Sequence, residues 1–377
     1  MSTPDLSTLT CILQKHFSLN YARIKCLTFL IVSIIESRCI NLSRLSMFIN
    51  SPASPSSVYK RLQRFMKQIS FNSKELSLFL MDIMCIPNDQ KLTLILDRTN
   101  WKFGKVHINI LYLAVAYKGM SIPLFYSLLE DKKQGNSDHF DRIDLIELFI
   151  SVHGKERIEC IMGDREFIGK EWVTWLNDEK IPYVLRIKES GQHLSNAKGK
   201  YVKAQKLLAF LKPNEKISLG VRTVGKTNGY KAYVSAIKNT KGELVVLIHT
   251  ANLYDPCELY RQRWEIEVMF KALKTGGFNL EDTHITDYDR IETLVSVLSI
   301  ACCFAYKIGE IVVKNSKVKL KNNGYKNHSV IRLGLDCILV FIRKRCKKAT
   351  DAVKSFFKNL IKTLCLNDFN TLDEIVL

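Results

Sequence analysis

DPCELYRQRWEIEVMFKALKTGG, residues 255–277, is the most informative stretch of this 377-residue chain. Asp255 and Pro256 suit the N-cap and the first position of a helix, and two glycines end the stretch. At about 100° per residue, one side is apolar and forms the expected core face: Ile266, Met269, Phe270 and Leu273. A second stripe, about a quarter-turn away, is polar: Tyr260, Arg263, Glu267, Lys271 and Lys274. Considered alone, such a stripe is typical of a solvent-exposed face with i,i+4 ion pairs.

The charge of the whole chain changes the weight of that interpretation. Lysine and arginine exceed aspartate and glutamate by 19, while the hydrophobic share of 47% is that of a folded globular protein. Such an excess favours a polyanionic partner, nucleic acid first and an anionic membrane surface second. A general basic bias in composition is the alternative.

The cysteines and the apolar runs point to an intracellular protein. Eleven cysteines are scattered without a CxxC pair or a Cys/His cluster, so we expect reduced thiols in a cytoplasmic protein. The polar N-terminus has no apparent secretory signal. The longest apolar run, 294–306, is too short to cross a bilayer and is expected to be a buried helix. No membrane partner is therefore expected.

The first 90 residues have helical patterns. A short helix at 41–49 and the breaker SPASP precede a second helix at 56–69. That second helix carries basic side chains: Lys60, Arg61, Arg64 and Lys67. A short helix, a turn and a basic helix resemble a helix-turn-helix that binds DNA. An ordinary small helical bundle with a charged face remains the alternative.

From residue 91 the pattern changes to strands, with runs at 91–96, 106–117, 122–129, 157–162 and 182–187. Helices are expected at 138–152, with Phe140, Ile143, Ile146 and Phe149 on its apolar face, and at 169–177. The order βββαβαβ predicts a mixed α/β layer. Residues 188–254 read as a β-rich insertion, with strands at 216–224, 230–237 and 244–249. Helices return at 290–313, 329–347 and 352–364, with basic runs at 314–326 and 343–348.

Two acids stand where buried strands end. Asp97 closes KLTLILD and Asp164 closes RIECIMGD. In open α/β sheets, sites form beyond the strand ends, and Glu267 adds a third candidate carboxylate. Three carboxylates repel one another unless a cation joins them, and hard oxygen ligands suit Mg²⁺ or Mn²⁺. Such ions can support an in-line phosphoryl transfer, and a nucleic-acid substrate would also explain the charge.

These motifs resemble a known family. LDRTNW (96–101), GDREF (163–167) and Tyr260-x2-Arg263-x3-Glu267-x6-Lys274 are similar to the DDE-type insertion-sequence transposases. Within these, the chain resembles the family defined by the YREK signature and a β-strand insertion, the insertion-sequence-four family. The resemblance covers roughly residues 90 to 345.

The resemblance implies an α/β fold with an RNase H-like mixed sheet core interrupted by the β-rich insertion, and helical N- and C-terminal regions. The expected parts are a helical DNA-binding region at 1–90, the core at 91–187 and 255–285, the insertion at 188–254, and a basic helical region at 286–377.

The resemblance also implies an activity. Asp97, Asp164 and Glu267 would be the catalytic and metal-binding triad for Mg²⁺ or Mn²⁺. Water would cut the transposon ends, and the freed 3′-OH would attack the opposite strand or target DNA. Tyr260, Arg263 and Lys274 would contact phosphates near the cleaved end. The partners would be double-stranded DNA, as terminal inverted repeats and target, and a second copy in a synaptic homodimer, in a prokaryotic cytoplasm at the nucleoid.

Other residues stay less defined. Arg98 and Arg165 follow the two aspartates and could bind DNA phosphates or pair within the protein. Lys271 is predicted to make an extra phosphate contact, and Glu166 is a conceivable metal ligand. The insertion contains no Trp, which argues against stacking a flipped base there. The alternative function is a transposase-derived, sequence-specific DNA-binding protein without catalysis.

Overall fold

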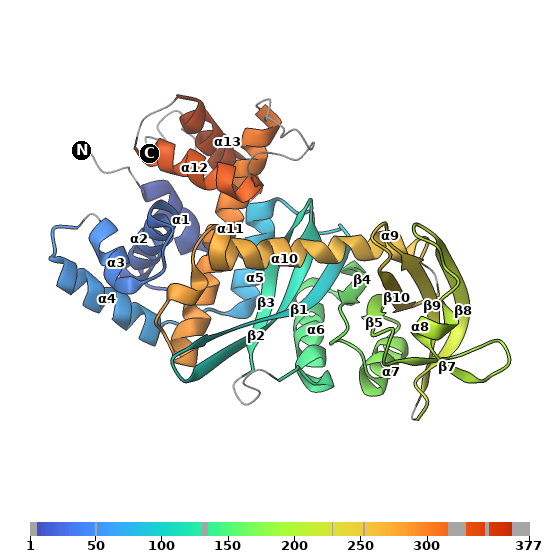
Figure 1. Ribbon diagram of the computed structural model, residues 1–377. Helices are drawn as coiled ribbons and strands as arrows, with labels where there is room; N and C mark the ends of the chain where they lie inside the picture. Colours follow the sequence, from blue (N-terminus) through green and yellow to red (C-terminus); the bar gives the residue numbers. More distant parts are fainter. Residues whose placement is uncertain are drawn as a thin grey trace. The chain divides into compact units, whose positions relative to one another are not determined.

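A computed structural model describes residues 6–49, 51–129, 135–227, 229–251, 253–315, 329–343 and 347–363. The chain forms two compact units (Figure 1). The sheet unit consists of Asn88–Asn100 and His107–Met269. The helical unit consists of Met1–Pro87, Trp101–Val106 and Phe270–Leu377. Each unit is described by itself.

Ten strands of the described chain form one mixed sheet in the order β3-β2-β1-β4-β5-β10-β9-β8-β6-β7. The first five strands along the chain are β1 (Leu92–Phe103), β2 (Val106–Tyr117), β3 (Met120–Leu128), β4 (Ile158–Gly163) and β5 (Tyr183–Ile187). β1, β4 and β5 run parallel, and β2 pairs with β3 in antiparallel fashion. The mixed α/β layer predicted from the βββαβαβ order is confirmed, and it is consistent with an RNase H-like core.

The central strands are apolar because both of their faces are covered. Residues Leu92 to Leu96 are all buried, and β4 has a single exposed position. Such unbroken burial, without alternation, is expected for central parallel strands. Helices α6 (His139–His153) and α7 (Lys170–Asp178) supply the crossovers between these strands and contact each other.

The buried face of α6 differs from the predicted one. Phe140 is 65% exposed, whereas the Arg142 side chain is buried with Leu145, Ile146 and Phe149. The expectation that Phe140 starts the core face was therefore wrong. A capping box between Asp138 and Asp141 fixes the helix start, so the buried stripe begins one turn later.

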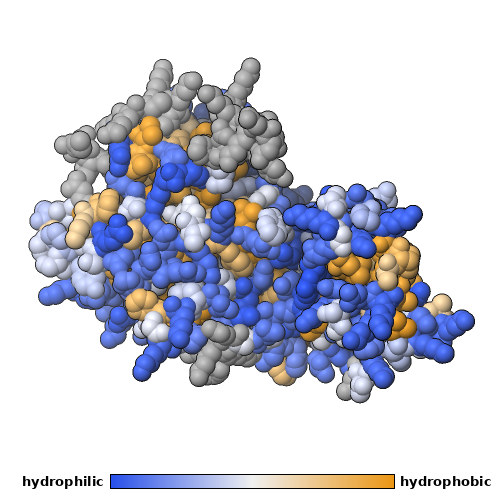
Figure 2. Space-filling model, viewed as in Figure 1, coloured by the Kyte–Doolittle hydropathy of each residue, from blue (hydrophilic) through white to orange (hydrophobic). Residues whose placement is uncertain are grey.

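The β-rich insertion is present and continues the sheet. Its strands are β6 (His193–Ser195), β7 (Tyr201–Lys203), β8 (Lys216–Val224), β9 (Tyr230–Lys238) and β10 (Leu244–His249), with α8 at Ala204–Leu207. β10 pairs with β5 in antiparallel fashion, so core and insertion share one sheet. The face drawn in Figure 2 is mainly hydrophilic, with separate hydrophobic patches, one of them over the end of the sheet that β8 to β10 form. The division of the chain into four predicted parts stays a prediction.

The helical unit is built around one long helix. Its members are α1 (Ser7–His16), α2 (Tyr21–Ser37), α3 (Leu42–Phe48), α4 (Pro55–Gln68), α5 (Ser73–Met84), α11 (Tyr288–Asn315), α12 (Val330–Ile342) and α13 (Lys347–Thr363). α11 packs against α2, α5, α12 and α13. A Cβ on Gly334 would lie 1.7 Å from the Ala305 carbonyl oxygen. Glycine there is what allows the backbones of α11 and α12 to touch.

α11 is long and apolar enough to cross a membrane by composition, but 78% of its most apolar window is buried within the protein. This matches the buried helix predicted at 294–306, since a helix in a protein core can be as long and apolar as a membrane-spanning one. The predicted basic run 314–326 lies almost entirely outside the described residues, as does the middle of the run 343–348.

Candidate active site

The parallel register brings the two predicted aspartates together. Leu96 of β1 is paired with Gly163 of β4, so Asp97 and Asp164 follow at equivalent positions on adjacent strands. Gly163 is also paired with Leu185, which places Arg186 of β5 beside Asp164. β1 continues to Phe103 and does not end at Asp97 as predicted, but its parallel pairing with β4 stops at Leu96. Asp97 directly after that pairing, Asp164 directly after β4 and Arg186 of β5 therefore place two acidic residues and one basic residue in a row.

Asp97 carries a largely buried carboxyl group that makes two polar contacts. Its Oδ1 accepts a hydrogen bond of 2.7 Å from the Arg98 amide, and its Oδ2 lies 3.3 Å from Arg263 Nη1. Burial, then the charges of Asp164 and Glu166, raises the pKa of Asp97 to about 7, although the Arg98 amide and Arg263 oppose the rise. The cost of burying the charged carboxylate therefore outweighs the contacts that Arg98 and Arg263 make to it.

Asp164 begins the loop that carries the GDREF motif. Its Oδ1 accepts a hydrogen bond from the Glu166 amide (2.9 Å), and its carbonyl oxygen accepts one from the Phe167 amide (3.0 Å). A Cβ on Gly163 would lie 2.6 Å from Phe167 Cβ. Glycine at this position is therefore required for Phe167 to fold back under the strand end.

A buried arginine that the sequence did not reveal braces this loop. Arg142 of α6 donates hydrogen bonds to the carbonyl oxygens of Glu166 (3.1 Å) and Ile168 (3.4 Å). Its guanidinium group also lies over the Phe167 ring, 5.2 Å from the centroid. These contacts fix the backbone directly after Asp164.

Arg98 is held inside the protein. Its Nε and Nη2 donate to the two carboxylate oxygens of Glu166 at 2.8 and 3.1 Å, and its Nη1 donates to Asn109 Oδ1 at 3.0 Å. Both members of the ion pair are largely buried, with 11% and 16% of their side chains exposed. This geometry favours internal pairing for Arg98 over a phosphate contact, and it occupies Glu166, which was considered as a metal ligand.

The stretch 255–277 is helical throughout, but it is not one uniform α-helix as predicted. It consists of α9 (Pro256–Leu259), a 3₁₀ turn (Tyr260–Arg263), α10 (Trp264–Lys271) and a π-helical turn (Ala272–Gly276). Asp255 accepts a hydrogen bond from the Glu258 amide, as expected of an N-cap. A 3₁₀ turn advances side chains by a different angle from an α-helix, so seven-residue spacing does not keep Tyr260 and Glu267 on one stripe.

Tyr260 is buried. Only 9% of the residue is accessible, and within the described chain its hydroxyl group has no hydrogen-bond partner. Burial, above all, raises the pKa of this phenol, and the charges of Arg263, Asp164, Arg186 and Asp97 also act on it. This burial argues against the solvent-exposed face that the stripe alone would indicate, and the predicted phosphate contact of Tyr260 stays a prediction.

Arg263 joins two of the three predicted acids. Its Nη2 is hydrogen-bonded to Glu267 Oε1, and its Nη1 to Asp97 Oδ2. The side chains of Arg263 and Asp97 are 15% and 16% exposed, while that of Glu267 is 36% exposed. Asp97, Arg263 and Glu267 thus form one chain of ionic contacts.

A second arginine cluster lies beside Asp164. Arg165 Nη2 and Arg186 Nη2 approach the same oxygen of Glu243, at 3.5 and 2.6 Å, and Arg165 is also 3.9 Å from Glu189. Arg186 was missed in the sequence, where the only signal is a charged residue inside the apolar run PYVLRI. Arg165 is partly exposed, so both predicted alternatives, internal pairing and phosphate binding, stay open for it.

The two remaining residues of the polar stripe belong to the helical unit. Lys274 Nζ pairs with Glu281 at 2.9 Å and lies 6.0 Å from the centroid of the Trp101 ring. Trp101 itself is only 7% exposed and packs within the protein. Lys271 is exposed. Their phosphate contacts stay predictions.

The predicted basic helix is α4, which packs against α3. Its exposed residues Lys60, Arg64 and Lys67 line a concavity of about 500 Å³ together with Gln63 and Arg290. Arg61 points inward, and its Nε and Nη2 are buried with no partner among the described residues. DNA binding by this helix stays a prediction, and Arg61 is the least accessible of its basic side chains.

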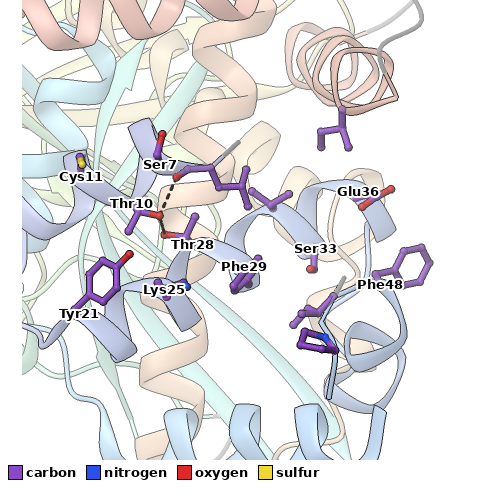
Figure 3. A pocket seen from close by; sticks show the side chains of 15 residues that line it. Ser7, Thr10, Cys11, Tyr21, Lys25, Thr28, Phe29, Ser33, Glu36 and Phe48 are labelled. Carbon is purple, nitrogen blue, oxygen red and sulfur yellow. Dashed lines mark hydrogen bonds between the residues drawn. The ribbon is translucent and has the colours of Figure 1, made fainter. Parts of the chain in front are cut away.

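A separate concavity of about 780 Å³ lies in the helical unit (Figure 3). Its lining is mainly apolar, with a hydrogen bond between the hydroxyl groups of Thr10 and Thr28. Glu36 is the one carboxylate among its lining residues. None of the predicted site residues lines it.

The donor chemistry at the strand ends suits a divalent cation. Among the described residues, no three His, Cys, Asp or Glu side chains are yet arranged to hold a metal ion. Asp97 and Asp164 nevertheless offer hard oxygen ligands on adjacent strands. Glu267 would complete the set once its oxygen leaves Arg263.

Comparison with known protein families supports the same conclusion. The sequence profile described as "Transposase DDE domain" matches residues 88–304, more than half of the chain. Comparison with curated proteins gives no match. The matched range contains Asp97, Asp164, Glu267 and the whole stretch 255–277. The chain therefore belongs to the family of proteins with a transposase DDE domain.

Proposed function

We propose that this protein is an active DNA transposase that cuts the ends of its own element and joins them to target DNA. The observation that carries this proposal is the register of β1 and β4, which sets Asp97 beside Asp164 directly after the last pair of their parallel ladder, Leu96 with Gly163. Arg263 contacts both Asp97 and Glu267 and so links the third acid to this pair. A protein that only binds DNA would not need two acids on adjacent strands and a third linked to them.

The reaction needs two phosphoryl transfers. In the first, water attacks a phosphodiester at the element's end, the P–O3′ bond breaks, and a 3′-OH and a 5′-phosphate result. In the second, that 3′-OH attacks a phosphodiester of the target strand and displaces its 3′ oxygen. Bound Mg²⁺ or Mn²⁺ would activate the attacking oxygen and neutralise charge on the phosphate.

The chain's own residues supply placement and charge. Asp97 and Asp164 would hold the ions, and Asp97 must lose the proton that its raised pKa retains near neutrality. Arg263 presents a guanidinium group suited to bidentate phosphate binding. Arg142 and the Arg98–Glu166 pair keep the loop after Asp164 in one geometry, so the acid does not have to be positioned when DNA arrives.

We further assign the chain to the YREK subfamily. Tyr260, Arg263, Glu267 and Lys274 have the required spacing inside the matched range, and a β-rich insertion separates Asp164 from Glu267. The partners in this proposal are double-stranded DNA, at terminal inverted repeats and target, and a second copy of the chain in a synaptic homodimer. The setting is the cytoplasm, at the nucleoid of a prokaryote.

Replacing Asp164 with Asn tests the proposal. We expect Asp164→Asn to bind a duplex of the element's terminal sequence as the wild type does and to lose Mg²⁺-dependent nicking of it. The matched control is Asp178→Asn, at an exposed aspartate of α7. If the wild type binds the duplex and never nicks it, the protein is a DNA-binding descendant without catalysis. Nicking by Asp164→Asn at the wild-type rate would exclude Asp164 from the chemistry.

A further inference from the structure

We propose that Arg263 acts as an internal cation, which occupies the metal-binding side of the acids until DNA arrives and thereby makes metal and DNA bind cooperatively. This inference rests on the proposed function and assigns Arg263 a role beyond phosphate contact. It starts from one observation. A single guanidinium group contacts Asp97 through one nitrogen and Glu267 through another.

Charge balance explains why the arginine lies there. Asp97, Asp164 and Glu267 are like charges, and Asp97 is buried where such repulsion is poorly screened. Glu166 adds a fourth carboxylate, but its two oxygens are engaged by Arg98. Arg263 is 15% exposed, so its positive charge is held close to the acids and away from water. In the absence of a metal ion, this ion pair offsets part of the cost of burying the charged Asp97 carboxylate.

The same contacts exclude a metal ion that both acids bind. Mg²⁺ binds oxygen ligands at about 2.0–2.1 Å and needs them in near-octahedral order. Asp97 Oδ2 and Glu267 Oε1 are both directed at Arg263, whose guanidinium group lies between the two carboxylates, and the other oxygen of Asp97 accepts a hydrogen bond from the Arg98 amide. The guanidinium group therefore has to leave before Glu267 can join Asp97 and Asp164 as a ligand.

A DNA phosphate provides the place to which Arg263 can move. Arginine binds phosphate through two parallel hydrogen bonds, which replace the two that it makes to the acids. The arriving backbone would thus free the acids, and the metal ions would neutralise them in turn. Because coupling between two binding equilibria is reciprocal, DNA must raise metal affinity by the same factor by which metal raises DNA affinity.

Binding of Mn²⁺ alone, measured by calorimetry or electron paramagnetic resonance on the DNA-free protein, tests this role. We expect Arg263→Gln to bind Mn²⁺ more tightly than the wild type, by on the order of tenfold, within the usual range of coupling energies. The matched control is Arg261→Gln. Arg261 lies two residues away, is 73% exposed and pairs with Glu258. The Arg261→Gln substitution removes the same charge as Arg263→Gln and should raise Mn²⁺ affinity much less.

The second arm measures coupling. Adding a duplex of the element's terminal sequence should tighten Mn²⁺ binding to the wild type by a similar factor and should change Arg263→Gln little. If Arg263→Gln does not fold, Arg263→Lys replaces it, because a single ammonium nitrogen on a different stem cannot reproduce the contact that two guanidinium nitrogens make with Asp97 and Glu267, and Mn²⁺ affinity should still rise. Mn²⁺ affinity equal to or below that of the wild type in the folded Arg263 variant, or no more than that of Arg261→Gln, would overturn the inference.

Asp97→Asn separates this inference from the proposed function. That variant should lose Mn²⁺ binding. If it binds Mn²⁺ as the wild type does, the metal assignment itself fails, whatever Arg263 does. If Asp97→Asn loses Mn²⁺ and Arg263→Gln gains nothing, only the role of Arg263 as an internal cation is wrong.

Discussion

Replacing Asp97 with Asn should stabilise the metal-free protein at alkaline pH while abolishing its activity. The Asp97 carboxyl is buried, and its pKa is raised from 3.8 to about 7. A pKa raised in the folded state means that ionisation opposes folding. The penalty is absent below the unfolded pKa of about 4, grows as pH rises from there, and is complete above the folded pKa near 7.

The size of the effect follows from the shift. About three pKa units at roughly 1.36 kcal/mol each give about 4 kcal/mol. Asn keeps an oxygen for the Arg98 amide, but its amide nitrogen would face Arg263 Nη1, which removes part of the gain. We therefore expect a net gain of about 1–3 kcal/mol at pH 8, or about 3–8 °C in Tm for a unit of this size.

Calorimetry with a chelator at pH 8 and at pH 4 measures this. The gain should be present at pH 8 and disappear at pH 4, and saturating Mg²⁺ should reduce it at pH 8 because only the wild type binds the ion. Asp351→Asn, at an exposed aspartate of α13, is the surface control. A Tm for Asp97→Asn equal to or below that of the wild type at pH 8 would refute the reasoning from burial.

Three further predictions concern the surroundings of the acids. Gly163→Ala places a Cβ 2.6 Å from Phe167 Cβ, so it should lower the free energy of unfolding by about 1–3 kcal/mol in urea denaturation, and an unchanged midpoint would contradict the packing argument. Arg142→Ala leaves buried carbonyl oxygens unpaired, so it should lower the free energy of unfolding by about 3 kcal/mol and remove most of the nicking activity. Full activity in the folded variant would show that the loop after Asp164 does not depend on Arg142. Glu243→Gln removes the negative charge that Arg165 and Arg186 share, so its DNA affinity in a salt titration should rise several-fold, on the order of 1 kcal/mol. The control is Glu171→Gln, at an exposed position of α7. Equal affinities of the two variants would mean that these arginines do not contact DNA.

Sequence pattern was sufficient for the core sheet because each central strand is an unbroken apolar run. It was also sufficient for the two aspartates, since parallel strand ends meet at one edge of a sheet, and the register of Leu96 with Gly163 confirms their proximity. The insertion was visible because its strands alternate with polar turns. These features depend on neighbours along the chain.

Contacts between distant segments were beyond the sequence. Arg98 meets Glu166 across 68 positions, so residue type alone left phosphate binding and internal pairing open for it. Arg263 meets Asp97 across 166 positions, and this ion pair was not predicted. The position of Tyr260 was missed for a local reason. A 3₁₀ turn changes the rotation of the side chains before α10, which a uniform helix pattern cannot represent. Arg142 was missed because a buried arginine contradicts the usual preference for apolar residues on a core face.

The central claim is that Glu267 acts with the two aspartates in metal-dependent DNA cleavage. The most direct test compares single-turnover nicking of a duplex of the element's terminal sequence by Glu267→Gln and by Glu258→Gln. Glu258 lies in the same helical stretch, is 66% exposed and pairs with Arg261. We predict that Glu258→Gln nicks at the wild-type rate with Mg²⁺, and that Glu267→Gln binds the duplex but nicks it at least about 10³-fold more slowly, a loss of about 4 kcal/mol. Wild-type nicking by Glu267→Gln would contradict the claim.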